Sequence, residues 1–174
     1  EARGGKTLAD VVEFGLEDIS KIHAQGLILE KVPPEATAYP ADLRGTYWVA
    51  NNLIFFVGAW NTDKVKKEEE PKALDDFGDP RWKGRLIAEP RDYEILIALT
   101  HKHKSLEKAR AVLARIAANN VEFHKGRSQL AEFLVAGQAA ACFTCYSHHY
   151  PARKRKGAPV DYMLTEGAAG IIAV

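Results

Sequence analysis

The stretch DDFGDPRWKGRLIAEPRDYE, residues 75–94, decides the class of fold. A Gly-Asp-Pro turn and a Trp-Lys-Gly turn form a corner, in which Pro80 fixes φ and Gly84 permits a tight approach. The apolar run of residues 84–90 then predicts a short strand between turns. Helical spacing begins at residue 92, so turn, strand and helix follow one another.

The same alternation runs through the rest of the chain. Strands are predicted over residues 8–14, 47–60, 121–124, 139–146 and 158–164, and helices over residues 16–25 and 92–103, between Ser105 and Asn119, and between Ser128 and Gly137. Tyr93, Leu96, Ile97 and Thr100 are expected to share the inward face of their helix. Strands that alternate with helices predict an α/β fold with a largely parallel sheet.

Composition narrows the function classes. The chain has 174 residues, of which 47% are hydrophobic and 27% charged, as is typical of a globular protein. Its formal net charge of +1 argues against a nucleic-acid partner or a membrane surface. The basic run of residues 153–156 has no interleaved aromatic residues, so it predicts a solvated corner or part of an interaction surface.

Catalytic motifs do not stand out. The sequence has no Ser-His-Asp order, nucleotide-binding glycine loop or paired-carboxylate motif, so an enzyme is not expected. Cys142 and Cys145 form a Cys-x-x-Cys inside a predicted strand, where side chains three residues apart face opposite sides. The two cysteines are therefore predicted to be buried free thiols.

Four motifs taken in order resemble a known family. They are GAWNTDKV (58–65), PKALDDFGDPRWKGRLIAEP (71–90), GRSQLAEFLVAGQAA (126–140) and KGAPVDYM (156–163). In this order they resemble the extracytoplasmic solute-binding proteins of ABC transporters, of the type 2 fold, in the subgroup that includes ferric-iron binders. The residue before Asn61 departs from the family's frequent tyrosine, because it is Trp60 here.

The resemblance implies two α/β lobes with a ligand between them, a hinge at crossing strands, and a periplasmic or extracytoplasmic location. It implies that residues 1–47 end lobe one, residues 48–166 form lobe two with a mixed, largely parallel sheet flanked by helices, and residues 167–174 return toward lobe one. The chain is then expected to be a fragment that lacks the start of lobe one and the C-terminal helices. A ligand-free homodimer is one alternative for such a fragment.

The resemblance also implies the ligand-binding residues. In open α/β sheets ligands lie outside the carboxyl ends of the strands, where Asp92 and Tyr93 follow one strand. Arg127 and Ser128 open a helix and could hold an oxyanion, although Ser128 could equally be a simple helix cap. The full set of expected ligand-binding residues is Trp60, Asn61, Asp92, Tyr93, Arg127, Ser128 and Tyr146.

A metal is the other candidate ligand. The iron binders of the family place adjacent tyrosines after the strand that ends here at Tyr146, and only one tyrosine falls on that motif. Tyr146 and His148 are therefore the candidate metal ligands, with iron as the candidate metal. The expected function is capture of a small anion or a metal–anion complex for the transporter's membrane subunits; ferric-iron binding and an enzyme on the same scaffold stay as alternatives.

Overall fold

A computed structural model describes residues 4, 9–164 and 170–173, with the side chains of residues 4 and 9–164. The chain forms two compact units, residues 1–54 with 170–174, and residues 55–169. The predicted lobe boundaries at 47/48 and 166/167 stay a prediction.

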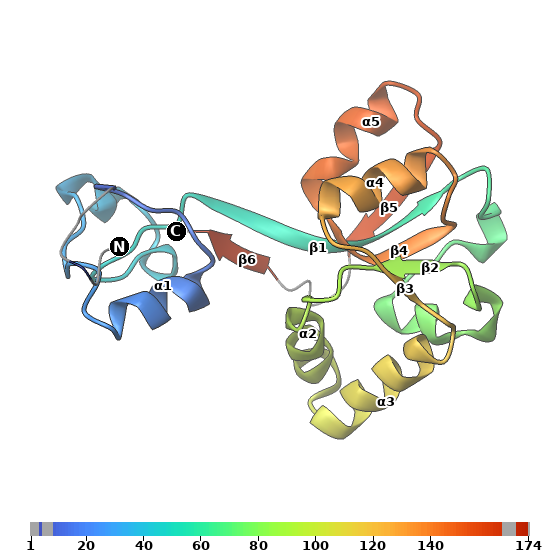
Figure 1. The fold of residues 1–174 in the computed structure, drawn as a ribbon, viewed down its shortest axis with the longest axis horizontal. Coiled ribbons are helices and arrows are strands. Elements are labelled where there is room, and N and C mark those ends of the chain that lie inside the picture. The colour runs from blue at the N-terminus through green and yellow to red at the C-terminus, as the bar shows by residue number, and fades with distance from the viewer. Residues whose placement is uncertain (1–3, 5–8, 165–169, 174) are drawn as a thin grey trace. The chain divides into compact units, whose positions relative to one another are not determined.

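The second unit is built on a mixed sheet (Figure 1). Its strands are β1 (Asn52–Asn61), β2 (Leu86–Ala88), β3 (Glu122–Phe123), β4 (Ala141–Tyr146) and β5 (Val160–Leu164), in the order β3-β2-β4-β1-β5. β2 runs parallel to β3 and β4, whereas β1 runs antiparallel to β4 and β5. A further strand, β6 (Gly170–Ala173), pairs with β1.

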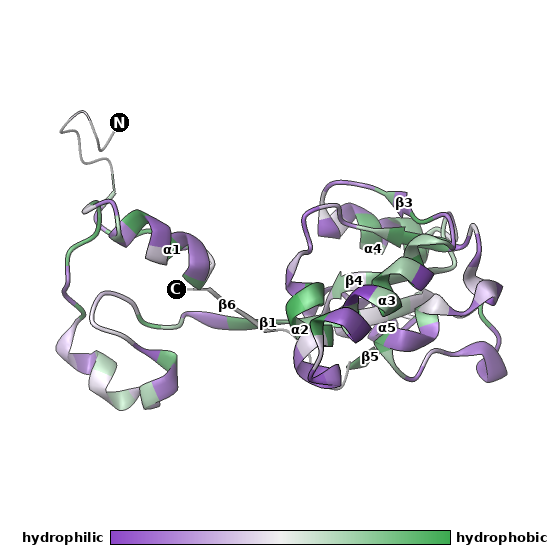
Figure 2. Ribbon diagram, turned by 90° about the horizontal axis from the view of Figure 1, so that it is seen from below, coloured by the Kyte–Doolittle hydropathy of each residue, from purple (hydrophilic) through white to green (hydrophobic). Residues whose placement is uncertain are grey.

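Helices cover both faces of this sheet. α4 (Arg127–Val135) and α5 (Pro151–Arg155) lie on one face, and α2 (Glu94–His103) and α3 (Leu106–Ala117) lie on the other (Figure 1). Hydrophobic residues follow the strands and the facing helices, while the outer loops are largely hydrophilic (Figure 2). The predicted α/β class, with a mixed sheet flanked by helices, is confirmed; the sheet is less parallel than predicted, because β1 pairs antiparallel with β4 and β5.

The corner in residues 75–94 is a packing feature. Trp82 is fully buried, and its ring centroid lies 5.4 Å from that of Phe77. The Asp79 carboxylate accepts a hydrogen bond from the Arg81 backbone N–H, which caps the short turn of Pro80–Trp82. Gly84 has a φ of +69°, a conformation that favours glycine. The packed corner therefore fixes the direction in which the backbone enters β2.

Helix boundaries follow the predicted signals in two of three cases. The Ser105 hydroxyl accepts a hydrogen bond from the Lys108 N–H and caps α3, and Gly137, with a φ of +68°, follows the end of α4. Ser128 is not the cap of α4, because Gly126 holds that position and α4 begins at Arg127. The prediction that Ser128 is a helix cap is wrong.

The inward face of α2 also differs from the predicted one. Tyr93 and Ile97 are 54% and 55% exposed, whereas Ile95 and Leu99 are buried. The face that packs in this unit is set by Ile95 and Leu99, which are four residues apart and lie one above the other. The stripe of Tyr93 and Ile97 turns toward solvent instead.

A β-bulge in β4 changes the expected facing of its two cysteines. Val57 lies opposite Cys145 and Ala59 lies opposite Cys142, so two residues of β4 stand against Gly58 alone. Because of this extra residue, both thiols enter the same core cluster, and the prediction of opposite faces is wrong. The prediction of buried free thiols is confirmed, and burial raises the pKa of Cys145.

The first unit has a smaller core. Its helix α1 (Leu16–His23) buries Ile19 against Ala50, with partly buried residues around them. The His23 ring stacks on Tyr47 at a centroid distance of 3.8 Å. The predicted strand over 8–14 is wrong for residues 9–14, which are exposed and irregular; Val11 is 88% exposed, so burial does not stabilise a strand there. Residue 8 lies outside the described residues.

Candidate functional site

Polar residues gather at one edge of the sheet in the second unit. Glu89 follows β2 directly, Arg127 opens the helix after β3, and Tyr146 ends β4. β2, β3 and β4 are parallel, so their carboxyl ends meet at the same edge. This edge is where open α/β sheets bind ligands.

Arg127 stands at the centre of this group. Its Nη2 donates a hydrogen bond to Asp92 Oδ1. Its guanidinium carbon lies 4.0 Å from the ring centroid of Tyr146 and 5.6 Å from that of Phe56. The Asp92 side chain is 2% exposed and that of Arg127 is 18% exposed, so the pair is mostly removed from water while part of the Arg127 side chain stays exposed.

Glu89 and Arg91 form a second pair beside the first. Glu89 Oε1 accepts hydrogen bonds from Arg91 Nε at 2.9 Å and Nη2 at 2.7 Å, and Oε2 accepts one from the Arg91 backbone N–H at 2.7 Å. The Glu89 backbone N–H donates to Thr144 Oγ1 on β4 at 3.0 Å. Burial raises the pKa of Glu89, but the bonds from Arg91 outweigh it and hold the pKa below its ordinary value.

Tyr146 and two histidines form the aromatic side of the site. The Tyr146 ring centroid lies 5.7 Å from that of His148 and 6.4 Å from that of His149. Burial raises the pKa of Tyr146, and the positive charge of Arg127 opposes this shift. Burial and the neighbouring His148 lower the pKa of His149 to about 4, so its ring is neutral near pH 7.

Several predicted residues come together here. The structure brings Asp92, Arg127, Tyr146 and His148 into one neighbourhood. Ser128 is exposed on the first turn of α4, next to Arg127. Tyr93 is the residue before α2, and more than half of its surface is exposed.

Trp60 and Asn61 lie elsewhere. Phe56 pairs with Tyr146 and Trp60 pairs with Ala141, so Trp60 is four residues, or about 13 Å, farther along β1. Asn61 is buried, its Nδ2 donates to the Leu134 carbonyl at 2.7 Å, and its Oδ1 accepts from the Asp63 N–H at 2.9 Å. Both residues are buried toward the opposite end of the sheet, away from the polar residues around Arg127.

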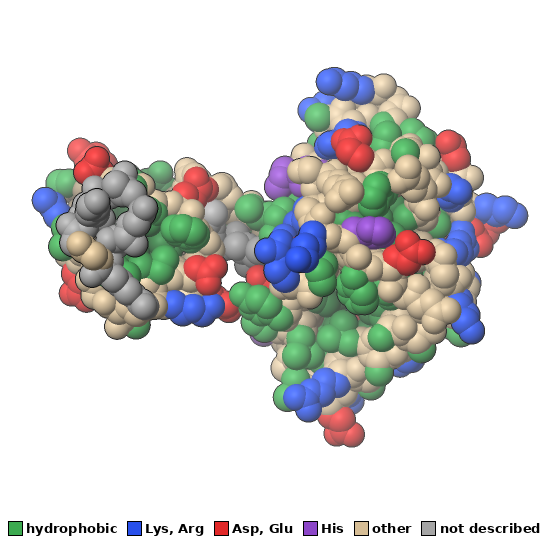
Figure 3. Space-filling model, in the orientation of Figure 1, with side chains coloured by type: hydrophobic (Ala, Val, Ile, Leu, Met, Phe, Trp, Pro, Cys, Tyr) green, Lys and Arg blue, Asp and Glu red, His purple; other side chains and the backbone are tan. Residues whose placement is uncertain are grey.

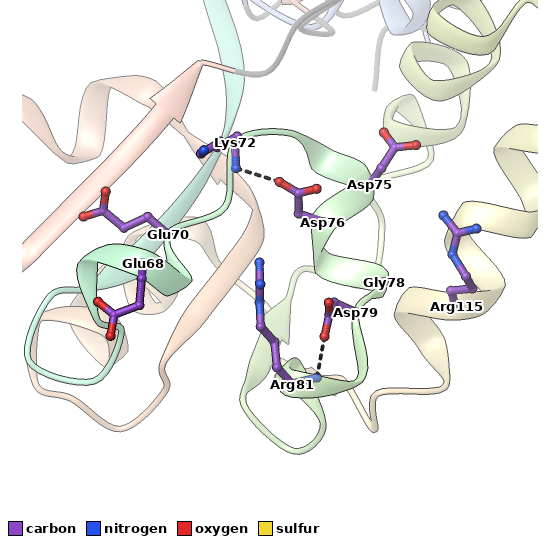
Figure 4. Close-up of a pocket in the computed structure, with 9 residues that line it drawn as sticks. All are labelled: Glu68, Glu70, Lys72, Asp75, Asp76, Gly78, Asp79, Arg81 and Arg115. Atoms are coloured by element: carbon purple, nitrogen blue, oxygen red, sulfur yellow. Dashed lines mark hydrogen bonds between the residues drawn. The ribbon is translucent and has the colours of Figure 1, made fainter.

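A surface cavity of about 450 Å³ lies away from this edge. The loops that precede β2 line one side of it, and α3 lines the other (Figure 4). Its lining includes several carboxylates, but Asp76 accepts from the Lys72 N–H and Asp79 from the Arg81 N–H. Asp75 pairs with Lys102 and His103. These bonds are those of a solvated, self-paired surface, and no predicted site residue lines the cavity.

Charges on the visible face of residues 55–169 are interspersed rather than sorted by sign (Figure 3). Within the described residues, no group of three or more His, Cys, Asp or Glu side chains is arranged to hold a metal ion. No helix in this part of the chain is long and apolar enough to cross a membrane.

Some members of the site carry no signal in the sequence. Phe56 reaches Arg127 only because β1 and β4 pair in one register, and Thr144 meets Glu89 only because β2 lies beside β4. Alternation along a single strand gives the face of a side chain but not its cross-strand partner. Arg91 was within reach of prediction, since it stands two residues from Glu89 in a turn.

Comparison with known proteins identifies the family. A family model described as bacterial extracellular solute-binding protein matches residues 13–172. The chain belongs to this family. It is a family of binding proteins, not of enzymes, and its extracellular character agrees with the predicted extracytoplasmic location.

The individual relatives share less than a third of their aligned residues with this chain. The chain is 28% identical over 106 residues to an Fe(3+)-binding periplasmic protein of Serratia marcescens, covering 60% of this chain and 30% of the relative. The periplasmic binding protein AfuA of Actinobacillus pleuropneumoniae, solved with fructose-6-phosphate, matches with a TM-score of 0.82 and 20% identity, over 99% of this chain and 58% of that one. Iron-bound HitA of Pseudomonas aeruginosa matches with a TM-score of 0.76 and 20% identity, over 99% of this chain and 61% of that one. The chain thus spans about three fifths or less of the length of these relatives.

Proposed function

We propose that this chain is the solute-binding part of an ABC-type importer and that its cargo is ferric iron accompanied by a small anion. The observation that carries the proposal is the position of Arg127, which lies over Tyr146 at the carboxyl edge of the sheet. The cargo would pass from this edge to the membrane subunits of a transporter.

Iron is favoured by the relatives and by Tyr146. Two of the similar proteins are named for iron: the Fe(3+)-binding protein of Serratia marcescens and iron-bound HitA. A phenolate oxygen is a hard ligand of the kind that suits a hard cation such as Fe³⁺. Tyr146 and His148 are the proposed metal ligands, and the remaining ligands would come from the anion and from water.

The anion follows from Arg127. A guanidinium about 4.0 Å from the phenol ring would repel a bare cation bound there. An anion that binds Arg127 and the metal at once removes this conflict, because a guanidinium binds oxyanions through charge-assisted hydrogen bonds. Ser128, exposed beside Arg127, is a second proposed donor to the anion.

The test is a titration of the protein with Fe³⁺ in the presence of inorganic phosphate or citrate. A phenolate–Fe³⁺ bond gives a visible charge-transfer band, which should be present in the wild type and absent in Tyr146→Phe. Tyr162→Phe, which changes a tyrosine on β5, is the matched control and should keep the band. A wild type without the band, or a Tyr146→Phe variant that retains it, would contradict the iron proposal.

A second candidate is an anionic solute without a metal, and Arg127 again supports it. The AfuA structure shows that the same fold can hold a sugar phosphate. Binding of phosphate, citrate or a sugar phosphate to metal-free protein, measured by calorimetry and lost in Arg127→Ala, would favour this candidate over iron.

A further inference from the structure

We propose that Asp92 decides whether this site takes a metal ion with its anion or an anion alone. The inference rests on the proposed function, since it concerns the ligand class of the same site. Asp92 acts through Arg127, so it is a positioning and specificity residue.

Charge balance is the first argument. Arg127 would repel a cation at Tyr146, but Asp92 pairs with it and is almost fully buried. Glu89 and Arg91 cancel in the same way beside them. With both pairs intact, the two arginines add no net positive charge to the neighbourhood of Tyr146, so a metal ion can approach. Without the Asp92 charge, Arg127 would stand unpaired and the site would favour anions.

The geometry of the pair is the second argument. An arginine and a carboxylate often pair through two parallel hydrogen bonds, but here Arg127 Nη2 and Asp92 Oδ1 make a single bond. Asp92 Oδ2 and Arg127 Nε are buried, and within the described residues neither has a hydrogen-bond partner. One is a negative oxygen that attracts a cation and the other is a donor that attracts an anion. Because both atoms are buried, a ligand would act on them through its charge: a metal ion at Tyr146 with its anion balances both, whereas an anion alone balances only the donor.

The position of Asp92 is the third argument. Its carboxylate bonds the Arg127 fork from the loop before α2, while the neighbouring rings of Tyr146 and Phe56 both lie beside the guanidinium. The carboxylate therefore fixes the direction of the fork as well as its net charge. A change that keeps the shape of Asp92 but removes its charge separates these two roles.

The experiment uses Asp92→Asn, which is nearly isosteric with the wild type. Each protein is titrated with Fe³⁺ plus inorganic phosphate, followed by charge-transfer absorbance, and with inorganic phosphate alone, followed by calorimetry. We expect Asp92→Asn to weaken Fe³⁺ binding roughly tenfold or more and to tighten binding of phosphate alone by a similar factor. Glu122→Gln, on exposed β3, removes the same charge elsewhere and should change neither affinity.

Two further variants separate the effect of the Asp92 charge from an effect on folding. Asp92→Glu keeps the charge and should retain Fe³⁺ binding. The double variant Asp92→Asn with Arg127→Gln removes both charges, so it should bind Fe³⁺ better than Asp92→Asn alone and should lose phosphate binding. The double variant also keeps the inference open to test if Asp92→Asn does not fold, because it leaves no unpaired buried charge.

The outcomes are distinguishable. If Asp92→Asn weakens Fe³⁺ and phosphate alike, Asp92 only supports the structure and the inference is overturned. Unchanged affinities for both ligands overturn it as well. A wild type that binds neither Fe³⁺ nor phosphate overturns the proposed function, and the inference with it.

Discussion

The orientation of the Arg127 side chain depends on residues of several other elements. Arg127 opens α4, but its side chain is oriented by Asp92 from another loop and by rings on β1 and β4. From the sequence, Asp92 is a candidate because it follows a predicted strand, and Arg127 because it opens a predicted helix. Tyr146 is a candidate because the family resemblance places tyrosine ligands after its strand. Their mutual contacts could not be predicted, because strand order and cross-strand register depend on long-range pairing.

The first prediction concerns the planar fork of Arg127. Arg127→Lys keeps the charge but loses the flat guanidinium that lies against the rings of Tyr146 and Phe56, and the parallel donors that recognise an oxyanion. We expect anion or ferric–anion affinity to fall about tenfold, while the free energy of unfolding changes by less than about 1 kcal/mol. Calorimetry and urea unfolding measure the two effects, and equal affinity in the variant would contradict the assignment.

The second prediction concerns His149. In the unfolded chain a histidine has a pKa of about 6.5, whereas the folded pKa is about 4. Between these values the unfolded chain binds a proton that the folded protein does not, so this group lowers stability as the pH falls from about 6.5 toward 4.

His149→Gln should therefore flatten the pH dependence of the unfolding free energy in that window. Urea unfolding at several pH values between about 4.5 and 7 measures the slope. His101→Gln, at an exposed position on α2, is the control and should keep the wild-type slope. A slope in His149→Gln that equals that of the wild type would contradict the prediction.

At the scale of elements, the loop after α3 depends on one buried amide. Asn119 Nδ2 donates to the carbonyls of Phe77 at 2.9 Å and Asp79 at 2.8 Å, so it joins this loop to the corner before β2. Asn119→Ala leaves both acceptors unpaired and should cost about 2–4 kcal/mol of unfolding free energy.

Asn119→Asp separates hydrogen bonding from volume, because it has nearly the same size but presents an acceptor to the two carbonyls. It should destabilise the protein at least as much as Asn119→Ala. Thermal or urea unfolding tests both variants, and an Asn119→Asp variant as stable as the wild type would show that the bonds contribute little.

Gly58 is the tightest point of β1. A Cβ there would lie 2.8 Å from Phe77 Cε2 and 2.8 Å from Met163 Cε. Gly58→Ala should therefore cost about 1–3 kcal/mol through overpacking. Gly157→Ala meets nothing within 4 Å and has only its φ of +81° against it, so it reports the backbone cost alone. A Gly58→Ala variant no less stable than Gly157→Ala would contradict the steric argument.

Local signals predicted the elements better than their faces. Gly84, Ser105 and Gly137 act through their own backbone or side chain, so their effects are visible in the sequence. The face of α2 and the bulge of β4 depend on what packs against them, and periodicity alone misplaces both. Ser128 failed as a cap because α4 begins one residue earlier, at Arg127, so that Gly126 holds the N-cap position.

At the scale of the whole molecule, the two units differ in how much core they hold. Residues 55–169 bury large side chains on both faces of a sheet, whereas the first unit buries Ile19 and Ala50 among partly exposed neighbours. Hydrogen exchange should therefore be slowest in β2, β4 and α4 and much faster in α1. Mass spectrometry of exchanged peptides measures this, and equal protection in α1 and β4 would contradict the difference.

The extra residue in β4 divides that strand into two segments whose side-chain alternation differs by one residue. Up to Cys142 the side chains alternate in step with Ala59 and Trp60 of β1, and from Cys145 onward they alternate in step with Val57 and Phe56. The alternation shifts by one residue at Phe143 and Thr144, so the half of β4 that ends at Tyr146 has a different register with β1 from the half before it. Removing one residue of β4 at this point would restore continuous alternation and a single register with β1. Cys142 would still lie opposite Ala59, Cys145 opposite Val57 and Tyr146 opposite Phe56, so the two thiols would stay on one face of the sheet without the bulge.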